Sequence, residues 1–176
     1  TTRRPRPKSS ARAMSPPVAA VITPHRFRRG PSPDGLGRAR LIRCGRYRLH
    51  VDRRPLIMGV LNVTPDSFSD GGRFRSPRAA LAHGLAMADA GADVIDVGGE
   101  STQPGARPVP LAEELRRTIP VIERLAKRVR IPIAVDTTKA EVARRSLEAG
   151  ASLVNDTSAL RDDPRMLETG LASDAG

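Results

Sequence analysis

Polar residues that could bind a ligand follow short apolar runs at four places in the chain. Asn62 ends the first run, and its amide offers an oxygen to a metal ion or an NH2 group to a phosphate. Thr102 supplies a hydroxyl for an anionic oxygen, beside glycines that let backbone N–H groups approach a ligand closely. Asp136 can accept paired N–H bonds from a heterocycle, and Asn155 offers a ring edge both a donor and an acceptor. These residue types predict a site for a ligand with anionic and heterocyclic groups.

Simpler explanations exist for each segment when it is taken alone. The acidic and serine residues of 66–70 could cap the following helix, and the glycines of 98–105 could merely permit a turn. Asp136 could be the N-cap of a helix that starts at Lys139, and Asp156 could act as a cap in the same way. The residues alone leave these alternatives open.

A regular alternation of apolar runs and amphipathic stretches, which begins at Pro55, must position these segments. The apolar runs predict buried strands, and the amphipathic stretches predict helices. Gly91 and Gly150 stand where helices should end, because glycine readily adopts the left-handed conformation of a C-cap. The expected strands are 56–61, 94–97, 131–135 and 152–154, the expected helices are 77–90, 111–128, 139–149 and a short one from about 163, and a hairpin is expected over 41–49.

Strand–helix alternation with short connections predicts an α/β fold with a parallel sheet and right-handed crossovers. A doubly wound sheet and a (β/α)8 TIM barrel both fit this order. A barrel gathers all its strand ends at one face, where its active site forms, whereas an open sheet favours its switch point. Polar residues follow all four strands here, which favours the barrel. Because a complete barrel has eight such units and about 250 residues, we expect this chain to carry about the first four and to be incomplete at its C-terminus.

The positive charge of the chain is concentrated near its N-terminus. The net charge is +11, of which residues 1–54 contribute +13 and residues 55–176 contribute −2. Residues 1–40 are rich in Pro, Arg, Ser and Gly, and they predict a disordered basic extension ahead of a domain over 41–176. Nucleic-acid binding is not favoured, because the basic excess lies in the extension and aromatic residues, on which bases stack, form only 2% of the chain.

Cysteine usage and hydropathy indicate the compartment. Cys44 is the only cysteine, so this chain forms no internal disulfide, and a reducing cytoplasm is the expected location. No apolar run approaches the roughly 20 residues that span a membrane. We therefore expect a cytoplasmic protein without a membrane partner.

Taken in order, the four segments resemble the dihydropteroate synthase family of folate biosynthesis, within the pterin-binding barrel superfamily. They read MGVLNVTPDSFSDGG over 58–72, GGESTQPGA over 98–106, VDTTK over 135–139 and VND over 154–156. The likeness runs from about residue 41 to residue 163. It implies a TIM barrel that condenses 6-hydroxymethyl-7,8-dihydropterin diphosphate with 4-aminobenzoate to give 7,8-dihydropteroate and diphosphate.

The resemblance also implies roles for individual residues. Asn62 would coordinate Mg²⁺ together with the diphosphate, and Thr102 would bind substrate. Asp136 and Asn155 would hold the pterin ring. The resemblance assigns no catalytic residue in this chain, and it implies a homodimer when the barrel is complete.

Gln103 departs from the family pattern, in which the loop usually reads Ser-Thr-Arg-Pro-Gly. The change removes a guanidinium fork that could stabilise diphosphate or position aminobenzoate. Later pterin-binding and diphosphate-binding residues of the family are also expected to be missing, so this chain alone is expected to be inactive. Two alternatives are a non-catalytic or truncated pterin-binding paralogue that associates with a partner chain, and a pterin-dependent methyltransferase, which would not be expected to carry residues 62–72 in this form.

Overall fold

The structure of the protein is a computed structural model that describes residues 41–52, 54–64, 77–101 and 106–176. The predicted extension over 1–40 lies outside the described residues, as does most of the first polar segment. Within the described ranges, no helix is both long and apolar enough to cross a membrane.

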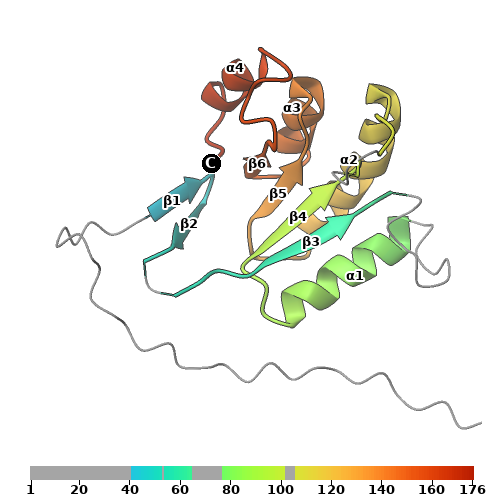
Figure 1. The fold of residues 1–176 in the computed structure, drawn as a ribbon. Coiled ribbons are helices and arrows are strands. Elements are labelled where there is room, and N and C mark those ends of the chain that lie inside the picture. Colours follow the sequence, from blue (N-terminus) through green and yellow to red (C-terminus); the bar gives the residue numbers. More distant parts are fainter. Residues whose placement is uncertain (1–40, 53, 65–76, 102–105) are drawn as a thin grey trace, which may run out of the picture.

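Four parallel strands form the central sheet, in the order β3-β4-β5-β6 (Figure 1). The strands are β3 (Met58–Asn62), β4 (Val94–Gly98), β5 (Ile133–Asp136) and β6 (Leu153–Asn155). The helices are α1 (Pro77–Asp89), α2 (Leu111–Ala126), α3 (Ala140–Glu148) and α4 (Met166–Leu171), each after one strand. The expected alternation is confirmed, and the three strand ends that carry Asn62, Asp136 and Asn155 extend one residue further than the apolar runs indicated.

The helices cover one face of the sheet and build a single main core against it. Helix α1 packs on β3 and β4, and α2 packs on β4 and β5. Alternate strand residues point into this layer and are almost fully buried, namely Leu61, Ile95, Val97, Ile133 and Val135. The strand order in the sheet is the same as the order along the chain, and the helices cover only one face. This is the topology of a (β/α)8 barrel, whereas a doubly wound sheet reverses its strand order and has helices on both faces. The chain forms four consecutive units of such a barrel.

Glycines end two of the helices, as expected. Gly91 and Gly150 have φ of +96° and +111°, which is the left-handed region. After α1, Ala92 donates its backbone N–H to the carbonyl of Met87, and the same arrangement follows α3. Each helix is therefore turned directly back into the next strand.

A β-hairpin precedes the sheet and contacts the last residues of the chain. Its strands are β1 (Leu41–Cys44) and β2 (Tyr47–His50), which confirms the predicted hairpin. Gly45 in its turn donates a hydrogen bond to the carbonyl of Asp174, and Figure 1 shows the C-terminus beside this hairpin. Cys44 is buried in this contact and has a free thiol.

Candidate ligand-binding site

One row of residues crosses the four strands at their C-terminal ends. Asn62 is paired with Gly98, Gly98 with Asp136, and Asp136 with Asn155. Paired residues in a parallel sheet share a face, and this face is opposite the one that the helices cover. Three of the four residues proposed from the sequence therefore lie side by side. Thr102, the fourth, lies outside the described residues, and so does Gln103.

Gly98 lets the side chains of the first and third members of the row approach each other over the backbone of β4. A methyl group on Gly98 would lie 3.0 Å from Oδ1 of Asn62 and 3.6 Å from Oδ2 of Asp136. The amide and the carboxylate thus both face the position that a side chain would fill. Glycine here lets a ligand approach the backbone between two polar groups.

Asp96 lies in the middle of β4, two residues before Gly98 and on the same face of the sheet as the row. The sequence did not lead us to identify it. It is 3% exposed, and its Oδ2 accepts a hydrogen bond from Nδ2 of Asn155 at 3.0 Å. Its Oδ1 is buried and has no partner among the described residues. Burial raises the pKa of Asp96, and the bond from Asn155 opposes this shift. The signal in the sequence was its spacing, because Asp96 precedes Gly98 by two residues and so shares its face.

Asp136 has a raised pKa of about 6. The first cause is burial, and the others are the charges of Asp96, Glu114, Asp156 and Glu100. It does not cap the next helix, because Lys139 is the N-cap of α3. The backbone N–H of Lys139 donates to the hydroxyl of Thr137 at 3.2 Å, and that of Ala140 donates to Oδ2 of Asp163 at 3.0 Å. A carboxylate held near a neutral pKa without a cation beside it is typical of a ligand-binding position.

Asp156 has a local role, but it is not the helix cap of the simpler explanation, because α4 begins only at Met166 and its N-cap is Arg165. The carboxylate of Asp156 accepts backbone N–H bonds from Ser158 at 2.8 Å and from Leu160 at 3.1 Å. These bonds fix the turn after β6. The neighbouring Asn155 remains the member of this segment that faces the row.

A partly buried ion-pair cluster lies beside the row and was also not identified from the sequence. Nζ of Lys139 donates to Glu100 at 2.5 Å and to Glu114 at 2.6 Å. The Glu114 side chain is only 1% exposed, and its other oxygen accepts a bond from the Thr137 hydroxyl at 2.6 Å. Burial alone would lower the pKa of Lys139, but the two carboxylates raise it. The cluster joins the segment after β4, helix α2 and the segment after β5.

A metal ion at this site would depend on few protein ligands. Among the described residues, no group of three or more His, Cys, Asp or Glu side chains could hold a metal. Oδ1 of Asn62 faces the space over Gly98 and is an oxygen of the type that Mg²⁺ prefers. Magnesium usually binds through one or two protein groups together with substrate phosphates and water, so this site fits an ion that arrives with a phosphorylated ligand.

The profile of one protein family, the pterin binding enzymes, matches residues 58–175, which include the whole row and the cluster. The chain belongs to this family. Dihydropteroate synthase of Bacillus subtilis is 53% identical over 118 residues, which are 67% of this chain and 41% of that protein. The enzyme from Synechocystis is 53% identical over 115 residues, 65% of this chain and 40% of its relative. The chain thus spans less than half the length of these pterin-binding relatives.

Solved structures of the family agree with the fold. Dihydropteroate synthase of Xanthomonas albilineans with 4-aminobenzoic acid has a TM-score of 0.66 at 55% identity, over 72% of this chain and 46% of the other. The Burkholderia cenocepacia enzyme complexed with 7,8-dihydropteroate has a TM-score of 0.67 at 41% identity, over 77% of this chain and 44% of the other. These likenesses confirm that the four units belong to a pterin-binding barrel.

Proposed function

We propose that the protein is a dihydropteroate synthase, and that this chain supplies part of its pterin-binding and diphosphate-binding site. The observation that carries the proposal is the row of Asn62, Gly98, Asp136 and Asn155 at the ends of four neighbouring strands. Similarity to dihydropteroate synthases over most of the described sheet supports the assignment.

Asp136 and Asn155 are suited to the ring of a pterin. A pterin edge presents adjacent N–H groups, and a carboxylate can accept two of them at once. Asn155 turns its NH2 group towards Asp96, so its carbonyl oxygen is left to accept from the ligand. Together they recognise the donor edge of the ring and fix its orientation on the inner face of the sheet.

Asn62 is suited to the other end of the substrate. We propose that its Oδ1 holds Mg²⁺, and that Thr102 binds substrate from the loop after β4. When bound, Mg²⁺ would neutralise charge on the departing diphosphate. The carboxylates of this site cannot do so.

The reaction exchanges one bond for another at the methylene carbon of the pterin. The carbon–oxygen bond to diphosphate breaks, and diphosphate leaves with the electron pair. The nitrogen of 4-aminobenzoate forms the new carbon–nitrogen bond and loses a proton. By holding the ring and the diphosphate at fixed positions, Asp136, Asn155 and Asn62 would align the carbon for attack.

The test is turnover of 6-hydroxymethyl-7,8-dihydropterin diphosphate and 4-aminobenzoate by the protein expressed from its full gene, with Mg²⁺ present. Formation of 7,8-dihydropteroate and equimolar diphosphate supports the proposal. The Asn62→Ala variant is expected to need a higher Mg²⁺ concentration for half-maximal rate, and Asp136→Asn is expected to bind the pterin more weakly.

Binding of the pterin without turnover would instead support the non-catalytic paralogue, which Gln103 favours at the position of the usual arginine. The Gln103→Arg variant separates the two outcomes, because it should raise the rate of a true synthase. A rate that stays unchanged or falls would remove the role proposed for this position.

We further propose that the protein is a cytoplasmic homodimer. The single cysteine supports a reducing compartment, and the family resemblance supports the dimer. Sedimentation of the full-length protein, at concentrations around those used for the assay, would measure the oligomeric state directly.

A further inference from the structure

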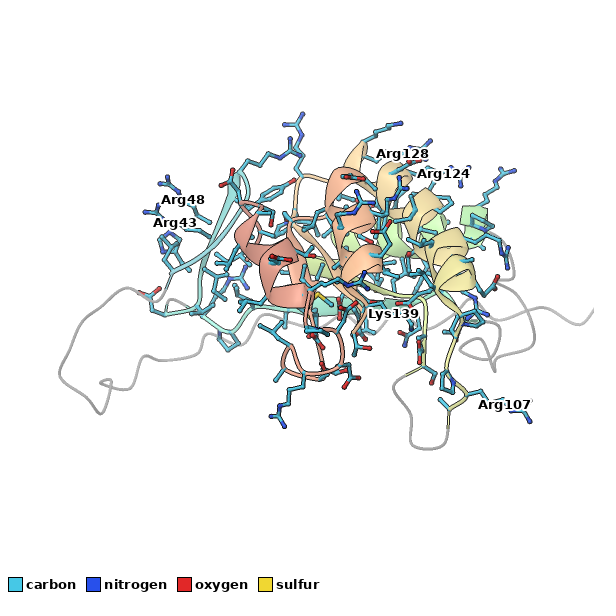
Figure 2. The ribbon with its side chains drawn as sticks, turned by 90° about the horizontal axis from the view of Figure 1, so that it is seen from above. Arg43, Arg48, Arg107, Arg124, Arg128 and Lys139 are labelled. Atoms are coloured by element: carbon cyan, nitrogen blue, oxygen red, sulfur yellow. The ribbon has the colours of Figure 1, made fainter. Side chains whose placement is uncertain are left out.

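Lys139 is the centre of a cluster in which one cation contacts two carboxylates. Its ammonium group contacts Glu100, whose side chain is 30% exposed, and Glu114, which is almost completely enclosed. Figure 2 shows Lys139 near the middle of the molecule, whereas Arg43 and Arg48 extend outward from the hairpin. The Lys139 side chain is 29% exposed and is held by the two carboxylates rather than extended into solvent.

The same two carboxylates act on Asp136 through space. The charged groups around Asp136 are Asp96 from β4, Glu100 from the segment after β4, Glu114 from α2 and Asp156 from the segment after β6, and all four are acidic. In the described part of the chain, Asp136 itself forms no ion pair. Nζ of Lys139 lies 2.5 Å from Glu100 and 2.6 Å from Glu114, two of the carboxylates that raise this pKa, so the charge of Lys139 opposes theirs from within the same cluster.

We propose that Lys139 is a positioning residue that holds Glu100 and Glu114 in place and offsets their charge, so that Asp136 remains an anionic acceptor for the ligand. The contribution to ligand binding rests on the proposed pterin-binding role of Asp136. The electrostatic contribution does not, because it concerns the ligand-free protein.

Charge balance distinguishes this role from simple packing. Without Lys139, both glutamates keep their negative charge, and Asp136 should gain its proton at higher pH. Without the charge of Glu114, Asp136 should lose its proton more easily. Opposite shifts from two residues in contact with each other are expected from electrostatics but not from a general loosening of the site.

The experiment measures the titration of the Asp136 carboxyl carbon by NMR in the ligand-free, full-length protein, with the signal assigned by its loss in Asp136→Asn. The wild-type midpoint is expected near the pKa of about 6. Lys139→Met should raise it by about one pH unit, and Glu114→Gln should lower it. The titration midpoint of Asp136 in the double variant Lys139→Met/Glu114→Gln should be higher than in Glu114→Gln by a similar amount.

The double variant also guards against failure to fold. Lys139→Met leaves the enclosed Glu114 charge without its cation, and that variant could be unstable. The double variant removes both charges, so its comparison with Glu114→Gln tests Lys139 in a neutral background. A midpoint that does not rise on loss of Lys139 in either background overturns the proposal.

A second readout connects the cluster to binding. A midpoint raised from about 6 to about 7 predicts that Lys139→Met binds 7,8-dihydropteroate about threefold more weakly at pH 6.5 and equally well at pH 8.5. A merely structural defect would weaken binding at both pH values. If the wild-type protein neither binds nor turns over pterins, the proposed function fails while the NMR result stands, so the two failures are distinguishable.

Discussion

Asn155 reaches across β5 to donate a hydrogen bond of 3.0 Å to Asp96, a residue 59 positions earlier in the chain. The strand between them carries Ala134 beside Asp96, and its small side chain leaves the path open. A carboxylate only accepts hydrogen bonds, so the NH2 group of Asn155 must point to Asp96. Asp96 therefore decides which atom of Asn155 is presented to a ligand.

Removal of this acceptor should release the amide of Asn155. We expect Asp96→Ala to weaken binding of 7,8-dihydropteroate by about tenfold, because one charge-assisted hydrogen bond that fixes the site is lost. Asp96→Asn keeps an acceptor oxygen and should stay within about threefold of the wild type. Calorimetric titration of the three proteins measures both effects, and equal affinities for the Ala and wild-type proteins would contradict this role.

The space over Gly98 should be needed by the ligand. Gly98→Ala places a methyl group 3.0 Å from Oδ1 of Asn62, and we expect at least about tenfold weaker binding of 7,8-dihydropteroate. Gly59→Ala is the matched control, because its methyl group would contact the flexible side chain of Met87 on the opposite, helix-covered face. Unfolding in urea should show a folded protein in both cases. Similar binding losses in the two variants would argue against a ligand at Gly98.

The row of polar residues could be predicted from the sequence because strand ends in this fold meet at one face. Asn62, Asp136 and Asn155 each end an apolar run, and period-two alternation places them on the inner face. Asp96 was missed because it sits inside an apolar run, where local pattern favours a core residue. Glu114 was missed because an acidic residue in the first turn of a helix has an ordinary explanation in the helix dipole. Only tertiary packing shows that it is enclosed against Lys139.

The hydroxyl of Thr137 should stabilise the fold through Glu114. Thr137→Val removes the 2.6 Å bond to a buried carboxylate oxygen, and we expect a loss of about 2 kcal/mol in the free energy of unfolding. Thr118→Val is the control, since Thr118 is equally buried but donates only to the backbone carbonyl of Glu114. The Thr118→Val variant should lose less than about 1 kcal/mol in its free energy of unfolding. Urea unfolding at pH 7 measures both values. Equal losses would show that the bond to the carboxylate stabilises the fold no more than the bond to the backbone carbonyl does.

Asp136 should make stability depend on pH in a direction set by its raised pKa. Its pKa rises from the ordinary 3.8 to about 6 on folding, so the folded chain holds the proton more tightly than the unfolded chain. The stabilisation is complete below pH 3.8 and is lost as pH rises through 6. For a fully enclosed group this shift corresponds to about 3 kcal/mol, and partial exposure to solvent reduces it to about 1–2 kcal/mol.

Asp136→Asn does not titrate, so its free energy of unfolding relative to wild type should increase by that amount between pH 4 and pH 7.5. The low pKa values of Glu113 and Glu141, both about 2, are common to the two proteins and cancel in this comparison. Urea unfolding of both proteins at the two pH values provides the test, and a difference that does not change with pH would show that Asp136 is not held in a site that favours its proton.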